Sequence, residues 1–271
     1  CGDCSVKSNC ASVVPIETEF GRKRAINQSS CNKDYSCLNG FCPSFVTIEG
    51  GRLRKGKGSD AKPTADADAW ANLPEPTLPK IGERPFSMLV TGIGGTGVVT
   101  IGALLGMAAH IEGKGCAVLD MAGLAQKGGA VISHVRIAEQ PEDIHAVRIA
   151  AGGADLLLGC DVVVAAAPDA LSKVEKGVTH AVINTHETIT GDFTRNPNME
   201  FPGRLLRLSI EAAAGAEASS FVDANRIATA LMGDSIASNL FMLGYAWQKG
   251  LVPMSAEAIE RAIELNGAAI E

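Results

Sequence analysis

Two groups of residues in this 271-residue sequence have the types and spacing that chemistry requires: cysteines near the start and a glycine turn further along. Six of the eight cysteines fall within the first 42 residues. Thiolates are ligands of iron–sulfur clusters and of zinc, and paired thiols form disulfides. The six are Cys1, Cys4, Cys10, Cys31, Cys37 and Cys42.

The cysteine-rich segment, residues 1–49, holds few strongly hydrophobic side chains, so it needs an internal staple to keep a shape. The soft thiolates and the Cys-Pro step at Cys42 favour an iron–sulfur cluster. Zinc held by thiolates alone is the second possibility, since all five histidines lie at or beyond His110. Disulfides are the third, and no signal peptide is visible to support them. The spacing indicates a metal or cluster without assigning individual ligands.

The glycine turn has the form of a phosphate-binding loop. Gly92, Gly94 and Gly97 follow a predicted buried strand, Phe86–Thr91, and open a predicted helix, while Asp120 ends the next predicted strand. This is formally the dinucleotide fingerprint, in which the helix start binds pyrophosphate and the carboxylate binds ribose. Three interpretations stay open: a nicotinamide or flavin site, a purely structural turn, and a site for another phosphate-bearing ligand.

These elements belong to a repeating pattern. After Pro85, short apolar runs alternate with helical spacing, which predicts an α/β fold: a Rossmann-like, mostly parallel sheet with helices on both faces. Residues 50–85, basic and glycine-rich and then proline-rich, form a predicted linker between the cysteine-rich segment and the α/β domain, residues 86–271. Strands are predicted at 86–91, 116–119, 130–137, 162–166, 181–184 and 205–208. Helices are predicted at 97–112, at 235–249 and after Ser255.

Composition excludes two classes of partner. The net charge of −6 gives no general attraction for nucleic acid or for anionic membranes. The uncharged stretch Pro85–Ile111 is 27 residues long, but its six glycines favour a strand, a turn and a helix over a membrane span. No targeting signal is visible, so a cytoplasmic location is expected.

Three further stretches make the pattern more specific: Gly94-Gly95-Thr96-Gly97-Val98-Val99, the polar loop with Gln126 and Lys127 that ends at Val131, and Asn239–Gly244. Together with the cysteines, they resemble the gamma part of the 2-oxoacid:ferredoxin oxidoreductases. The resemblance is strongest to the fused bacterial indolepyruvate ferredoxin oxidoreductases and covers nearly the whole chain.

The resemblance implies a large enzyme that decarboxylates an aryl 2-oxoacid on thiamine diphosphate, passes electrons through [4Fe-4S] clusters to ferredoxin and releases an acyl-CoA. The implied partners are the thiamine-binding domains, ferredoxin, the 2-oxoacid and CoA. The thiamine signature, Gly-Asp-Gly followed by paired asparagines, is absent from the sequence, so decarboxylation is not expected on this chain alone. The implied cluster ligands are the six cysteines, of which Cys1 looks like the middle of a longer run that begins upstream. The implied cofactor-binding residues are Gly94, Gly95, Thr96, Gly97, Gln126, Lys127 and Asn239.

Two alternative functions remain: a stand-alone NAD- or FAD-binding redox module, and a non-catalytic scaffold domain of a larger complex. Alternative interpretations also stay open for four of the single residues. Gln126 and Lys127 also fit a solvated loop, Asn239 also fits a buried amide that caps a neighbouring loop, and Asp120 also fits a loop cap.

Overall fold

The structure is a computed structural model, and its contacts divide the chain into two compact units: Cys1–Lys55 with Glu187–Pro202, and Gly56–His186 with Gly203–Glu271. Of the predicted site residues, Cys1, Cys42, Gln126 and Lys127 lie outside the part of the chain that the structure describes. The described residues are 4, 10, 12–28, 30–31, 33–38, 44–51, 73–123, 128–190, 196, 198–232 and 234–267.

The first unit contains a β-hairpin that the sequence analysis did not predict. Strands β1 (Val13–Thr18) and β2 (Gly21–Ile26) pair antiparallel in direct register. The hairpin turns at Gly21, which has φ 81°. The guanidinium of Arg22 donates a hydrogen bond of 3.3 Å to the carbonyl of Met199, which ties the segment after residue 187 to the hairpin.

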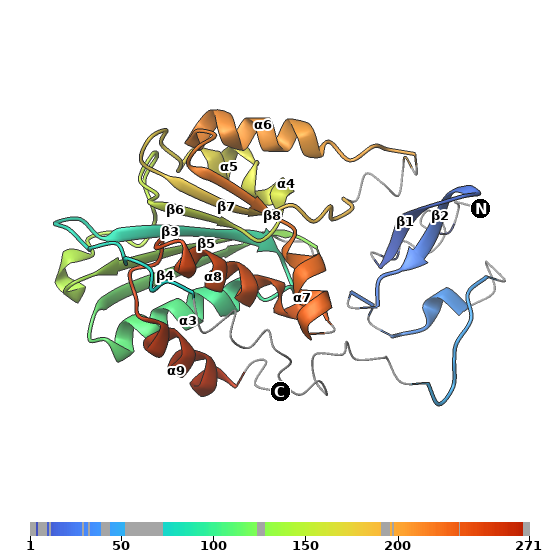
Figure 1. The fold of residues 1–271 in the computed structure, drawn as a ribbon, viewed down its shortest axis with the longest axis horizontal. Coiled ribbons are helices and arrows are strands. Elements are labelled where there is room, and N and C mark those ends of the chain that lie inside the picture. The colour runs from blue at the N-terminus through green and yellow to red at the C-terminus, as the bar shows by residue number, and fades with distance from the viewer. Residues whose placement is uncertain are drawn as a thin grey trace. The chain divides into compact units, whose positions relative to one another are not determined.

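The second unit is built on a six-stranded sheet with the order β4-β5-β3-β6-β7-β8 (Figure 1). Strands β3, β6, β7 and β8 pair in parallel, whereas β5 pairs antiparallel with both β3 and β4. The mostly parallel sheet is therefore confirmed, with one reversed strand. The strands are β3 (Phe86–Ile93), β4 (Gly115–Ala122), β5 (Ala130–Ala138), β6 (Leu156–Gly159), β7 (His180–Asn184) and β8 (Ser219–Val222).

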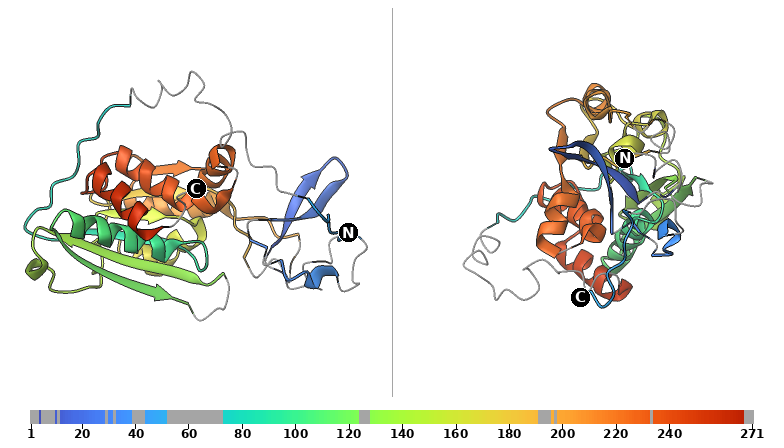
Figure 2. Two further views of the ribbon diagram at one scale, coloured as in Figure 1. Left: turned by 90° about the horizontal axis from the view of Figure 1, so that it is seen from below. Right: turned by 90° about the vertical axis from the view of Figure 1, so that its right-hand side faces the viewer.

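Helices cover both faces of this sheet, as the sequence predicts. Helices α3, α8 and α9 lie on one face, and α4, α5 and α6 lie on the other (Figures 1 and 2). Apolar side chains of α3, among them Ile101, Leu104 and Leu105, form the main core with Val90 and Val135 of the sheet. The helices are α3 (Val98–Ile111), α4 (Val162–Ala165), α5 (Pro168–Leu171), α6 (Gly203–Ala214), α7 (Ala224–Met232), α8 (Ser238–Gln248) and α9 (Ala256–Asn266).

Two predicted strands are wrong. Residues 162–166 form helix α4, because the buried carboxylate of Asp161 accepts a hydrogen bond of 2.9 Å from the Val164 amide and caps a helical turn. The neighbouring buried strand is β6, which ends at Gly159, three residues before Val162. Residues 205–208 lie inside α6, which buries Ile210 and leaves Leu205 and Leu208 exposed. The strand that follows α6 is β8.

The long uncharged stretch Pro85–Ile111 folds as predicted into β3, the glycine turn and α3. Over the residues that the structure covers, no helix has both the length and the apolar character needed to cross a bilayer. The predicted N-cap of the last helix is also confirmed, since the Ser255 hydroxyl accepts a hydrogen bond from the Ala258 amide.

Candidate functional site

The glycine turn, residues 94–97, joins β3 to α3 at the carboxyl ends of the parallel strands. The turn is closed on Ile93, whose carbonyl accepts hydrogen bonds from the Thr96 amide at 3.3 Å and the Thr96 hydroxyl at 2.7 Å. Gly95 and Gly97 have φ values of 86° and 91°. Side chains rarely adopt this left-handed conformation, which explains glycine at both positions.

Gly92 lets the helix approach the sheet closely. A Cβ atom at Gly92 would lie 2.5 Å from Cγ2 of Val98 and 3.2 Å from Cβ of Cys160. The start of α3 therefore rests directly on the ends of β3 and β6, where ligands bind in open α/β sheets.

The start of α3 is suited to an anion. Gly97 is the N-cap residue and offers no side-chain cap, and the first turn of this 14-residue helix carries no acidic residue. The unpaired amides and the helix dipole together place partial positive charge at such an end. Gly95 and Thr96 are exposed, so a phosphate can reach this end of the helix.

The loop between β4 and β5 lies beside the turn. The Gly94 amide donates a hydrogen bond of 2.8 Å to the carbonyl of Gly129, just after the predicted Gln126 and Lys127. Both predicted side chains fall outside the described residues, so their contacts stay a prediction. The bond between Gly94 and Gly129 nevertheless places the end of their loop at the glycine turn.

Asn239, in the first turn of α8, holds the glycine turn from the other side. Its side chain is 4% exposed, and its Nδ2 donates a hydrogen bond of 2.8 Å to the carbonyl of Thr96. This contact corresponds to the loop-capping interpretation of the residue. The turn is thus fixed by β3, by the β4–β5 loop and by α8, which supplies the rigidity that a binding loop needs.

The sequence analysis missed a second buried amide side chain, which also lies at the carboxyl ends of the strands. Asn184, at the end of β7, is 2% exposed and donates hydrogen bonds to the Cys160 carbonyl at 3.1 Å and to Asn225 Oδ1 at 2.7 Å. Its Oδ1 accepts a hydrogen bond of 3.1 Å from the Ala224 amide. An amide that ends a buried apolar strand was the available signal. Asn184 joins the ends of β6 and β7 to the start of α7.

Of the two cysteines of the α/β unit, both predicted to be buried thiols, Cys160 is buried and Cys116 is half-buried. Burial, together with the neighbouring Asp161 charge, raises the pKa of Cys160 to about 12, and burial raises the pKa of Cys116 to about 11. Both therefore stay protonated near neutral pH and are poor nucleophiles or metal ligands.

Asp120 does not occupy the position that the dinucleotide fingerprint requires. It lies on β4, and β5 separates β4 from the strand that carries the glycine turn. Two strand spacings put β4 about 10 Å from β3. Asp120 Oδ1 would lie 3.6 Å from a Cβ atom at Gly102, so it is near the body of α3 and away from the turn. This arrangement does not favour binding of an NAD or FAD ribose at Asp120.

The structure describes four of the six clustered cysteines. Cys4 is buried, Cys10, Cys31 and Cys37 are half-buried, and Cys31 Sγ accepts a hydrogen bond of 3.4 Å from the Lys33 amide. Within the described ranges, no three or more cysteine, histidine or acidic side chains are grouped so as to hold a metal ion. Since Cys1 and Cys42 lie outside those ranges, the complete ligand set stays a prediction.

Comparison with known proteins identifies the class of this α/β unit. The model of the pyruvate ferredoxin/flavodoxin oxidoreductase family matches residues 87–270. The chain belongs to this family, and the predicted 2-oxoacid:ferredoxin oxidoreductase class is confirmed.

Two curated relatives show which members of the family this chain is similar to. The chain is 27% identical over 186 residues to indolepyruvate oxidoreductase subunit IorB of Pyrococcus horikoshii, covering 68% of this chain and 87% of the relative. It is 27% identical over 183 residues to the protein of the same name from Archaeoglobus fulgidus, covering 66% of this chain and 84% of that one.

One solved structure supports the fold, and a second is similar to the chain to a lesser degree. The 2-oxoglutarate:ferredoxin oxidoreductase of Magnetococcus marinus, with 2-oxoglutarate, coenzyme A and succinyl-CoA bound, matches with a TM-score of 0.51 and 14% identity, over 69% of this chain and 28% of that one. Pyruvate oxidoreductase subunit PORC of Thermotoga maritima matches with a TM-score of 0.47 and 20% identity, over 68% of this chain and 85% of that one.

Proposed function

We propose that this chain is the gamma-type part of an indolepyruvate-type 2-oxoacid:ferredoxin oxidoreductase, which decarboxylates an aryl 2-oxoacid to an acyl-CoA and reduces ferredoxin. Family membership and the relatives named for indolepyruvate support the proposal. The observation that carries it in the structure is the glycine turn, held by Gly129 and Asn239 at the uncapped start of α3.

The residues of this turn fit a phosphate-bearing ligand, either CoA or thiamine diphosphate. The amides at the start of α3 would hold a phosphate, while Asn239 keeps Thr96 and the turn in place. Lys127 and Gln126 would approach the same phosphate from the β4–β5 loop. When bound, CoA accepts the acyl group and thiamine diphosphate stabilises the carbanion formed on decarboxylation. The chain's own part is to bind and orient, and the thiamine-binding partner supplies the remaining groups.

The cysteine-rich segment would carry the electron-transfer group. We expect the six thiolates to provide ligands for a [4Fe-4S] cluster that passes electrons toward ferredoxin. Anaerobically purified chain should then contain iron and sulfide, and Cys4→Ser or Cys10→Ser should lower both. Cys116→Ser is the control, because Cys116 belongs to the α/β unit.

Ligand titration of the full chain, together with its thiamine-binding partner, tests the glycine-turn site. Thr96→Glu places a negative charge on the exposed turn, so binding of CoA or of thiamine diphosphate should weaken at least about tenfold. Ala103→Glu adds the same charge to an exposed position further along α3 and should leave binding unchanged.

Two results would contradict this assignment. Saturable NAD binding that Thr96→Glu removes would favour the stand-alone redox module. Binding of both CoA and thiamine diphosphate that is equally insensitive to the two substitutions would assign the phosphate site to other residues.

A further inference from the structure

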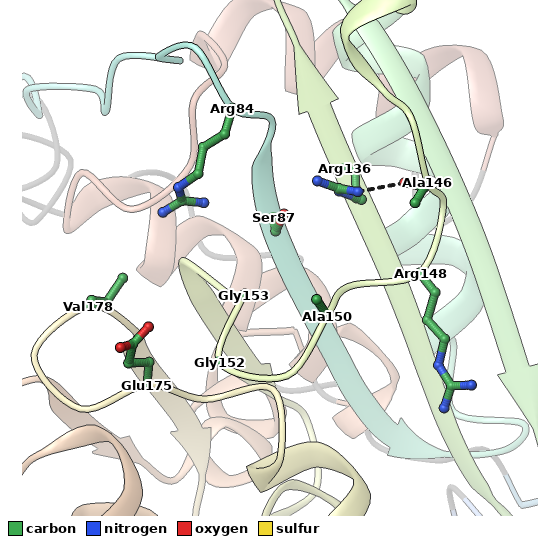
Figure 3. Close-up of a pocket in the computed structure, with 10 residues that line it drawn as sticks. All are labelled: Arg84, Ser87, Arg136, Ala146, Arg148, Ala150, Gly152, Gly153, Glu175 and Val178. Atoms are coloured by element: carbon green, nitrogen blue, oxygen red, sulfur yellow. Dashed lines mark hydrogen bonds between the residues drawn. The ribbon is translucent and has the colours of Figure 1, made fainter.

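A cavity lies at the opposite ends of the strands from the glycine turn. This cavity of about 470 Å³ is lined by residues at or before the amino ends of β3, β6 and β7 and by Arg136, near the carboxyl end of β5 (Figure 3). Ser87 and Arg136 are cross-strand partners, so they share one face of the sheet. Strand β3 separates this cavity from the glycine turn by about 20 Å.

Three arginines line the cavity, and one of them is already neutralised. Arg84 makes a two-pronged ion pair with Asp155, with bonds of 2.9 Å and 2.5 Å. The Asp155 carboxylate also accepts a hydrogen bond of 2.8 Å from the Ser87 amide. The hydrogen bond to Asp155 raises the pKa of Arg84. This pair therefore belongs to the framework of the cavity.

The other two arginines lack such a partner. Among the described residues, neither Arg136 nor Arg148 forms an ion pair with a carboxylate. Arg136 Nη1 donates a hydrogen bond of 2.6 Å to the Ala146 carbonyl, but its Nε is buried without an acceptor in the described structure. A buried guanidinium donor without an acceptor is costly, so an oxygen atom of a ligand placed at Arg136 Nε would be stabilising.

The surroundings of His134, on the same face of β5, show that this region is electropositive. Its Nδ1 accepts a hydrogen bond of 3.2 Å from the Ile149 amide, which fixes the loop that carries Arg148. Burial, and then the positive charges of Arg148 and Lys173, lower the pKa of His134 to about 4.

The only acid that lines the cavity in the described structure is on the far wall. Glu175 lies beside Gly152, where its carboxylate would be 3.5 Å from an added Cβ atom. Figure 3 shows Arg84 and Glu175 on one side of Ser87, and Arg136 and Arg148 on the other. Arg136 and Arg148 therefore keep their positive charge on that side of Ser87, and the Arg148 side chain extends away from Arg136 (Figure 3).

We propose that this cavity is a binding site for a small oxyanion, a carboxylate or a phosphate, held by Arg136 with Arg148 at the rim. A guanidinium presents planar, charged donors that suit both kinds of anion. The bound anion would supply the acceptor that Arg136 Nε lacks and would join β5 to the loop before β6. Because the site is about one strand length from the glycine turn, an anion bound there would stabilise or regulate the chain without contacting the ligand of that turn.

Binding of inorganic phosphate and of acetate to the full chain tests this proposal. Each anion is titrated at constant ionic strength with sodium chloride as balance, and binding is followed by calorimetry and by the thermal unfolding midpoint. The wild-type chain should bind at least one of them saturably, with a raised midpoint. Arg136→Gln should weaken binding about tenfold or more.

Arg148→Gln keeps the test decisive if Arg136→Gln does not fold, because Arg148 is exposed and its substitution leaves the core intact. Arg261→Gln, at an exposed arginine of α9, is the matched control. Phosphate binding alone would identify a phosphate ligand, and acetate binding alone a carboxylate. Absence of saturable binding by both anions, or equal binding by the Arg148 and Arg261 variants, would overturn the proposal.

Discussion

His134 makes folding stability depend on pH in a direction that the structure fixes. Its side chain is 1% exposed and neutral, and it accepts the Ile149 amide hydrogen bond. Its pKa is about 4 in the folded chain and has the ordinary value of 6.5 when unfolded. As pH falls through this window the unfolded chain binds the proton more readily, so stability is lost on acidification.

The expected loss is about 3 kcal/mol between pH 7 and pH 4, which follows from the separation of the two pKa values. Other groups titrate in the same window, so the effect of His134 is isolated by comparison with His134→Gln. Glutamine stays neutral and keeps an oxygen that can accept the Ile149 hydrogen bond. Urea unfolding at several pH values, in amine buffers free of phosphate and acetate, gives the free energies of unfolding.

The wild-type chain should be more stable than the variant at pH 7, and this advantage should shrink by about 3 kcal/mol as the pH approaches 4. His110→Gln, at an exposed histidine of α3, is the control for replacing a histidine by glutamine outside the core. If wild type and His134→Gln lose stability in parallel over this window, the buried neutral histidine is not the cause and the argument fails.

Two further experiments test the packing of α3 and the support of the glycine turn. Gly102→Ala in α3 would place Cβ 2.7 Å from Ser133 Oγ, whereas Gly244→Ala in α8 meets nothing within 4 Å. The Gly102 variant should therefore be less stable than the Gly244 variant by about 1–3 kcal/mol in urea unfolding. Equal stabilities of the two variants would contradict the close packing of α3. Asn239→Ala removes the hydrogen bond to Thr96 and should cost about 1 kcal/mol while weakening phosphate-ligand binding, and a variant with wild-type affinity would show that the turn needs no support from α8.

The sequence predicted the elements next to the glycine turn well, because their signals are local. An apolar strand, glycines that require left-handed backbone, and helical spacing after Gly97 all point to the same structure. For the apolar run 162–166, the local signals did not all point to one structure. Its five valine and alanine residues fit a buried strand or a helical turn equally well, and the capping carboxylate of Asp161 was the signal that decided for the helix.

The arginine cavity could not be predicted in this way. Its residues come from separate segments between Arg84 and Val178, and no two of its arginines share a local motif. They meet because Ser87 pairs with Arg136 and because β6 lies beside β3. Both are long-range pairings that periodicity does not encode, since an alternating pattern is the same for a parallel and an antiparallel strand.

The direction of β5 determines which residues lie near each of the two proposed sites. In a fully parallel sheet, the loop before β5 would lie at the amino ends of the strands, far from the glycine turn. Because β5 is reversed, its start lies beside the glycine turn, where the Gly94 amide bonds to the Gly129 carbonyl, while Arg136 near the other end of β5 lines the cavity next to Ser87. Because β5 also lies between β3 and β4, Asp120 on β4 is displaced from the place beside β3 that the ribose-binding strand of a dinucleotide fold occupies. The position and direction of this one strand thus set the surroundings of the glycine turn at one end of the sheet and of Arg136 at the other.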